Sequence, residues 1–167
     1  ILTASVASGE DLAVTSGVVT SALNIWGLAE GNVSENAKHV ADVVQQAANV
    51  SSLGMQDFAV ALQYAGAPAN ALGVQIEELS AALALIKNKG IDASTAGTSL
   101  RAMFTRLSAP PKAAAEALKK MGVVTKDASG NFIGLEKTVS QMRIAMKGMS
   151  NTERIALAQA VAGTEGY

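Results

Sequence analysis

Residues 90–111 read GIDASTAGTSLRAMFTRLSAPP, and their pattern decides the fold class of the chain. Apolar side chains recur in this stretch every three or four residues, the spacing that places them on one face of an α-helix. They are Ala96, Leu100, Met103, Phe104 and Leu107, and the four larger ones are predicted to be buried. Asp92 or Ser94 can cap the start of this helix, and the double proline at 110 and 111 cannot continue it.

The same periodicity runs through nearly the whole chain. Alanine, the best helix former, fills 32 of the 167 positions. Further helices are predicted over residues 10–28, 34–48, 54–64 (with a short restart over 67–72), 76–90, 111–121, 134–149 and 150–162. Pro68 is expected to break or restart the helix that begins near Gly54. Residues 1–167 are thus predicted to form a single compact all-α domain of about seven or eight short helices.

One segment favours β-structure. Residues 123–133 read VVTKDASGNFI, where Asp127 and Gly130 suit the first and last positions of a turn. The segment therefore predicts a small β-hairpin, which must pack on helices because an isolated hairpin is only marginally stable.

Charge is distributed unevenly along the chain. Residues 1–85 carry eight acidic side chains and one lysine, a net charge of −7, whereas residues 86–167 carry twelve Lys and Arg against six acids, a net charge of +6. Such an acidic half and basic half can attract each other within one molecule, which is the favoured interpretation. Head-to-tail association between copies and a basic face for an anionic partner are the alternatives.

Candidate catalytic and metal-binding residues are few. The chain has no cysteine, and His39 is its one histidine, with Glu35 and Asp42 on neighbouring turns of the same predicted helix. One imidazole without thiolates is poor zinc chemistry, so we interpret His39 as a surface residue. Glu77 and Glu78 point about 100° apart on a helix and cannot jointly flank one bond. Acids in the first turn of a helix, which stabilise its N-terminus, explain them better.

These observations predict a protein that is not an enzyme, with no catalytic, cofactor-binding or metal-binding residues. No serine lies in a G-x-S-x-G elbow, and no glycine-rich stretch has the pattern of a phosphate-binding loop. The basic half offers Lys87, Lys89, Arg101, Arg106, Lys112, Lys119, Lys120 and Lys126. Arg101 and Arg106 diverge by about 140° on an ideal helix, and few aromatic side chains are available to stack on bases. No sequence-specific binding of nucleic acid is therefore expected.

Two uncharged stretches approach the length of a membrane-spanning helix. They are residues 12–29 and 58–76. The first is rich in Ser, Thr and Gly, and the second is interrupted by Gly66 and Pro68, so buried amphipathic helices are the favoured interpretation. A membrane-active helical domain is the alternative.

The order of several landmarks resembles a region of the tail tape measure proteins of long-tailed bacteriophages and prophages. The landmarks are ANVS at 48–51, QYAGAPA at 63–69, EELSAALALI at 77–86, Gly-Ile at 90–91, AGTSLR at 96–101, RL-x-x-P at 106–110 and D-x-x-G at 127–130. The resemblance extends over most of the chain, from about residue 10 to residue 163.

This resemblance implies a non-enzymatic structural component of the virion. Proteins of this family occupy the lumen of the phage tail, set tail length during assembly in the bacterial cytoplasm and leave ahead of the DNA. The implied partners are tail tube proteins, tail-tip proteins and tail assembly chaperones, with possible self-association and possible transient contact with the host membrane, where a membrane-active domain would assist genome delivery. Because residues 1–3 are Ile-Leu-Thr and no signal peptide is visible, we expect a fragment of a much longer tape measure protein.

Overall fold

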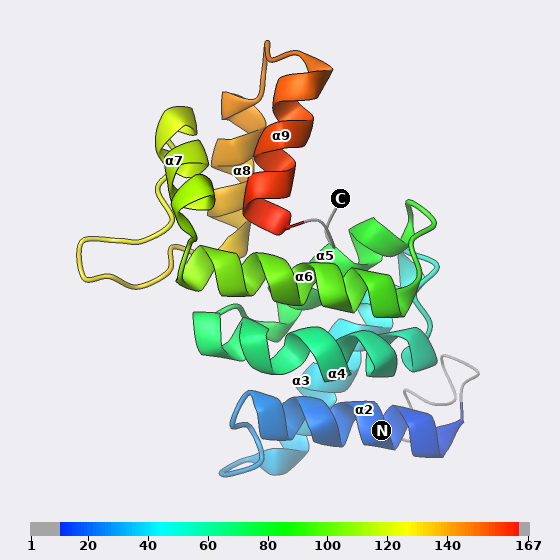
Figure 1. Ribbon diagram of the computed structural model, residues 1–167. Coiled ribbons are helices and arrows are strands. Elements are labelled where there is room, and N and C mark those ends of the chain that lie inside the picture. The colour runs from blue at the N-terminus through cyan, green and yellow to red at the C-terminus, as the bar shows by residue number, and fades with distance from the viewer. Residues whose placement is uncertain (1–10, 164–167) are drawn as a thin grey trace.

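The computed structural model describes residues 11–163, which contain eight α-helices (Figure 1). The helices are α2 (Leu12–Ile25), α3 (Val33–Asn49), α4 (Met55–Leu72), α5 (Ile76–Lys87), α6 (Ala93–Ser108), α7 (Lys112–Met121), α8 (Leu135–Ala145) and α9 (Asn151–Ala162). The predicted all-α class and the number of helices are confirmed.

Helices α2, α4 and α6 lie side by side, with α3 and α5 behind them and α7, α8 and α9 at one end (Figure 1). Two clusters of buried side chains hold these helices together. The larger cluster unites α2 to α6 with the first residue of α8, and the smaller one unites the end of α6 with α7, α9 and the half-buried methionines of α8 and of the turn that follows it. Leu72, Met103 and Phe132 pack against both clusters and join them.

Helix α6 is the element that both clusters share. The Asp92 carboxylate caps it by accepting hydrogen bonds from the Thr95 hydroxyl at 2.6 Å and the Thr95 N–H at 2.9 Å, which lower the pKa of Asp92. Leu100, Phe104 and Leu107 are buried, as predicted, but Met103 is only half-buried because it lies at the junction of the clusters.

The contact between α4 and α6 is close because a glycine lies in it. A Cβ at Gly97 of α6 would be 2.9 Å from the carbonyl oxygen of Ala61 and 3.0 Å from its Cα, both backbone atoms of α4. Helix α4 offers small side chains to this contact, and Ala61 and Ala65 are fully buried. The glycine therefore lets two backbones approach to a distance that a side chain would prevent.

The predicted break in α4 is wrong. The helix is continuous from Met55 to Leu72, and Pro68 lies inside it instead of starting a separate helix over 67–72. A proline removes one N–H from the helix, here the one that would reach the carbonyl of Tyr64. Ala65 and Ala69, on either side of this gap, are both fully buried, so packing holds the helix together across it.

The predicted hairpin over 123–133 is also wrong. The described residues contain no strand there, only one isolated antiparallel bridge between Lys126 and Phe132. Pairing stops because the backbone of Val124 is already bonded to a side chain: its N–H donates to Gln141 Oε1 at 3.0 Å, and its carbonyl accepts from Gln141 Nε2 at 3.2 Å.

Helix α8 is shorter and less buried than its pattern predicts. It ends at Ala145 rather than near residue 149, and a turn containing Gly148 at a φ of 83° follows. Its buried side chains are Leu135 and Thr138, whereas Val139 is 46% exposed. Helix α9 then starts with a capping box, in which Ser150 and Glu153 bond to each other.

Replacing Gly17 with alanine is expected to raise the free energy of unfolding by about 0.5–1 kcal/mol. Gly17 lies inside α2, and a Cβ there would meet nothing within 4 Å, so the gain in helix propensity carries no steric cost. Urea unfolding followed by circular dichroism measures the change. Gly73→Ala is the control, because Gly73 has a φ of 82° and alanine there is strained. A Gly17→Ala protein less stable than the wild type would contradict this reading of α2.

Candidate functional site

The titratable residues singled out in the sequence do not converge on one centre. His39 Nε2 lies 2.6 Å from Glu77 Oε1 on α5, and about half of each side chain is exposed. Glu35 instead accepts a hydrogen bond from Asn32 at the start of α3. Across residues 11–163 no three His, Asp or Glu side chains are grouped so that they could hold a metal ion.

Glu78 has a role that the sequence did not reveal. Its Oε1 accepts hydrogen bonds from the N–H groups of Leu135 at 3.0 Å and Glu136 at 3.2 Å, the first two residues of α8. Position 134, which precedes α8, is a glycine and has no side chain to cap the helix. One carboxylate in the first turn of α5 thus also caps the N-terminus of α8 and holds the start of α8 beside α5.

Removing this shared cap should destabilise the fold. Glu78→Ala is expected to lower the free energy of unfolding by about 0.5–2 kcal/mol, the range for loss of a helix cap. Hydrogen exchange should accelerate most at the N–H groups of Leu135 and Glu136. Glu77→Ala is the matched control, because Glu77 is the neighbouring acid and bonds to an exposed histidine. Equal losses in both variants would contradict the capping role of Glu78.

A shallow groove separates α2 from α4 on the surface. It has a volume of about 560 Å³ and is lined by Val14, Gly17, Val18, Ser21, Asn24, Ile25, Gln56, Ala59, Leu62, Gln63 and Ala67. No lining side chain is charged, because the two uncharged stretches of the sequence form these two helices. Their other faces are buried in the larger cluster, as the amphipathic interpretation predicted. No helix within residues 11–163 combines the length and hydropathy needed to cross a bilayer.

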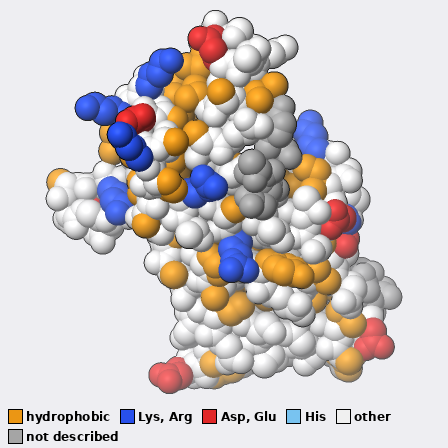
Figure 2. Space-filling view, in the orientation of Figure 1, with side chains coloured by type: hydrophobic (Ala, Val, Ile, Leu, Met, Phe, Trp, Pro, Cys, Tyr) orange, Lys and Arg blue, Asp and Glu red, His pale blue; other side chains and the backbone are white. Residues whose placement is uncertain are grey.

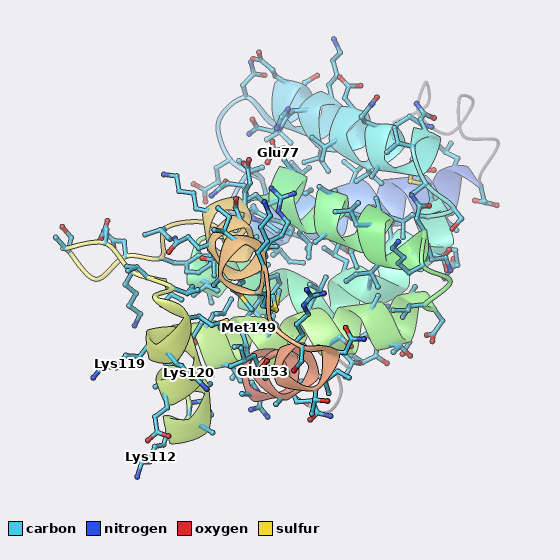
Figure 3. The ribbon with its side chains drawn as sticks, turned by 90° about the horizontal axis from the view of Figure 1, so that it is seen from above. Glu77, Lys112, Lys119, Lys120, Met149 and Glu153 are labelled. Carbon is cyan, nitrogen blue, oxygen red and sulfur yellow. The ribbon has the colours of Figure 1, made fainter. Side chains whose placement is uncertain are left out.

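Positive charge is concentrated on α7. Lys112, Lys119 and Lys120 are exposed there, and Lys112 and Lys119 point away from the body of the molecule (Figure 3). Figure 2 shows this concentration of Lys and Arg over α7, whereas the surface over α2 and α4 is nearly free of charge. We call the exposed side of α7 formed by these three lysines the basic face.

Compensation between the two halves of the sequence is limited. Within residues 11–163, one ion pair joins them, between Lys87 Nζ and Asp57 Oδ2 at 3.0 Å, close to the boundary. Lys120 lies near Glu153, whose pKa is lowered first by the hydrogen bonds from Ser150 and then by this lysine. In the described part of the chain, Lys112 and Lys119 have no carboxylate within ion-pair distance. Ion pairs within the described residues therefore do not account for the charges of Lys112 and Lys119.

The two arginines of residues 90–111 also diverge, as predicted. Arg106 donates to the carbonyl of Ala160 on α9 at 3.4 Å, whereas Arg101 is exposed on α6. They form no joint site, and this segment serves the packing of helices.

Comparison with known proteins identifies relatives among phages. The chain is 35% identical over 154 residues to a protein named "Tape measure protein" of Pneumococcus phage Dp-1, which covers 92% of this chain and 13% of that protein. It is 37% identical over 114 residues to a "Probable tape measure protein" of Escherichia phage P2, which covers 68% of this chain and 14% of that protein. The chain thus spans about one seventh of the length of these relatives. No solved structure matches it.

The sequence profile of the family described as "Phage-related minor tail protein" matches residues 1–163. This match covers nearly the whole chain and agrees with both relatives, so the resemblance seen in the sequence is confirmed. The chain belongs to the phage-related minor tail protein family.

Proposed function

We propose that this chain is a folded, non-enzymatic part of a tape measure protein, which sets the length of a phage tail during assembly and leaves ahead of the DNA. The observation that carries the proposal is the match of two phage tape measure proteins to 92% and 68% of the chain. Its partners are then tail tube proteins, tail-tip proteins and assembly chaperones, and its place is the lumen of the tail, reached from the cytoplasm of the host.

Within such a protein this segment would not do the measuring. The eight helices of residues 11–163, of 10 to 18 residues each, fold back on one another around shared clusters of buried side chains. A measuring segment has to be extended, and a continuous helix of the described length would span about 230 Å at 1.5 Å per residue. A folded segment contributes far less to the length of the tail.

Deletion of residues 11–163 in frame from the gene of the parent phage tests this proposal. Electron microscopy of the assembled tails should show a length almost equal to that of the wild type. A matched control deletes the same number of residues from a heptad-rich part of the parent protein, and these tails should be shorter by about 230 Å. Shortening by this amount on deletion of residues 11–163 would show that the segment is extended in the tail.

The deletion could also prevent tail assembly, so a second measurement is needed. Antibodies against residues 11–163 should detect the segment in purified, DNA-filled virions of the wild-type phage and lose the signal after ejection. Virions without the segment would contradict a place in the tail lumen.

The membrane-active alternative rests on the two uncharged stretches, and the fold gives them another role as packing faces of α2 and α4. We expect the chain to release no dye from neutral or anionic liposomes at neutral or mildly acid pH. Release of dye from the liposomes would support the membrane-active alternative.

A further inference from the structure

The fold separates charge in space as well as in sequence. Residues 11–108 carry eight acidic and five basic side chains, a net charge of −3, and residues 109–163 carry four acidic and eight basic side chains, a net charge of +4. The second group is α7, α8 and α9, at one end of the molecule (Figure 1). We propose that a second copy of this chain binds the basic face of α7 through the acidic side of its α3.

The basic face is open and its cations are available. Helix α7 buries Ala114, Ala117, Leu118 and Met121 toward the smaller cluster and leaves its three lysines in solvent. Lys112 and Lys119 lie seven residues apart, about two turns, so they share one side of the helix. Glu116 is exposed on the same side of α7, between Lys112 and Lys119 along the helix, so α7 carries three positive charges and one negative charge and has a net charge of +2.

The acidic side is formed by the turn between α2 and α3 and by the exposed side of α3. Its acids are Glu30, Glu35 and Asp42, all exposed. Glu30 and Asp42 form no ion pair in the described structure, whereas Glu35 is bonded to Asn32. Lys38 is the single cation among them.

The two charged surfaces cannot meet within one molecule. Helices α3 and α7 lie on opposite sides of the fold in both ribbon views (Figures 1 and 3). A contact between copies that joins the two surfaces is therefore head to tail, and such a contact produces either a closed ring or an open series of copies. Copies joined by such a contact form assemblies larger than a dimer.

A second copy fits these surfaces better than nucleic acid does. Each molecule carries both charge signs, with a total of only −1, so copies bring the complementary charge without strong overall repulsion. A nucleic acid would be attracted to α7 and repelled by the acidic side. Base stacking also needs aromatic side chains, and α7 has none.

Sedimentation velocity of the 167-residue chain at increasing concentration tests this proposal. The weight-average mass should rise beyond that of a dimer at low salt, and the association constant should fall about tenfold or more between about 50 mM and 500 mM NaCl, as surface charges are screened. A chain that stays monomeric at all concentrations overturns the proposal.

Charge reversal identifies the surfaces. Lys112→Glu with Lys119→Glu, and separately Glu30→Lys with Asp42→Lys, should each abolish self-association, because each protein then presents two like surfaces. An equimolar mixture of the two should associate again as a heteromer. The control is Lys89→Glu with Arg101→Glu, the same change of charge at exposed residues outside α7, which should associate as the wild type does.

Several outcomes would overturn the assignment. Self-association that survives reversal of the lysines of α7, or that the control abolishes equally, shows that this face is not the contact. A mixture of the two reversed proteins that stays monomeric shows that the surfaces do not meet. Retarded migration of duplex DNA that needs Lys112 and Lys119, in a chain that does not self-associate, assigns the basic face to nucleic acid. Circular dichroism spectra and unfolding curves like those of the wild type verify that each variant folds.

Discussion

Replacing Phe104 with alanine is expected to lower the free energy of unfolding by about 3–5 kcal/mol. Phe104 is 1% exposed and belongs to the larger cluster, on the helix that both clusters share. Its removal would leave a cavity that the neighbouring side chains fill only in part, because α6 is held on one side by α4 and on the other by α9. Urea unfolding monitored by circular dichroism measures the loss.

A control substitution at an exposed apolar residue distinguishes the effect of burial from the effect of removing apolar surface. Leu85 is 69% exposed on α5, and Leu85→Ala should leave stability within about 0.5 kcal/mol of the wild type. If Phe104→Ala unfolds at the same urea concentration as the wild type, then the apolar face of α6 is not the centre of the fold.

The second large effect is expected at Gly97, where addition of a single methyl group should be harmful. Gly97→Ala should lower the free energy of unfolding by about 1–3 kcal/mol, even though alanine favours a helix, because its Cβ would meet the backbone of Ala61. Backbone atoms cannot move aside singly, so α4 and α6 have to separate, and side chains along their contact lose packing.

Gly66→Ala is the matched control for Gly97→Ala. A Cβ at Gly66 would lie 2.8 Å from Cδ1 of Ile25, the end of a flexible side chain that can change its rotamer. We expect a smaller loss at Gly66 than at Gly97. The reverse order would show that α4 and α6 can separate easily.

Local signals in the sequence predicted most of the helices. Asn32 and Ser150 are each followed by a glutamate three positions later, and these two polar residues cap the starts of α3 and α9. The glycine at 90 follows the end of α5. These signals succeed because a cap depends on residues three or four positions apart. A short stretch of sequence therefore contains every residue that forms the cap.

The failures come from contacts between residues distant in the chain. Continuity of α4 through Pro68 depends on burial of alanines on both sides, and the missing hairpin depends on Gln141, which takes the hydrogen bonds of Val124. The local conformational propensity at Pro68 or in VVTKDASGNFI does not indicate the burial of the alanines around Pro68 or the hydrogen bonds of Gln141. Tertiary contacts therefore decided both outcomes.

The same difference between local signals and distant contacts applies to the candidate functional residues. The absence of cysteine and the single histidine could be read directly, and they limit the possible metal chemistry. The hydrogen bond between Glu78 and α8 could not be predicted from the sequence, because 57 residues separate Glu78 from Leu135. Gly134 before α8 is the one signal in the sequence, because a glycine has no side chain with which to cap the helix. It indicates that another residue must cap α8, but not which residue.

The unequal size of the two clusters has a consequence for how this protein comes apart. Among the largest fully buried side chains, only Leu107 and Val161 belong to the smaller cluster. The segment from α7 to α9 should therefore open at a lower free energy than α2 to α6, as a separate cooperative unit. If the chain must pass through a narrow tube, unravelling would begin at this end, and the α4–α6 contact would be the last to yield.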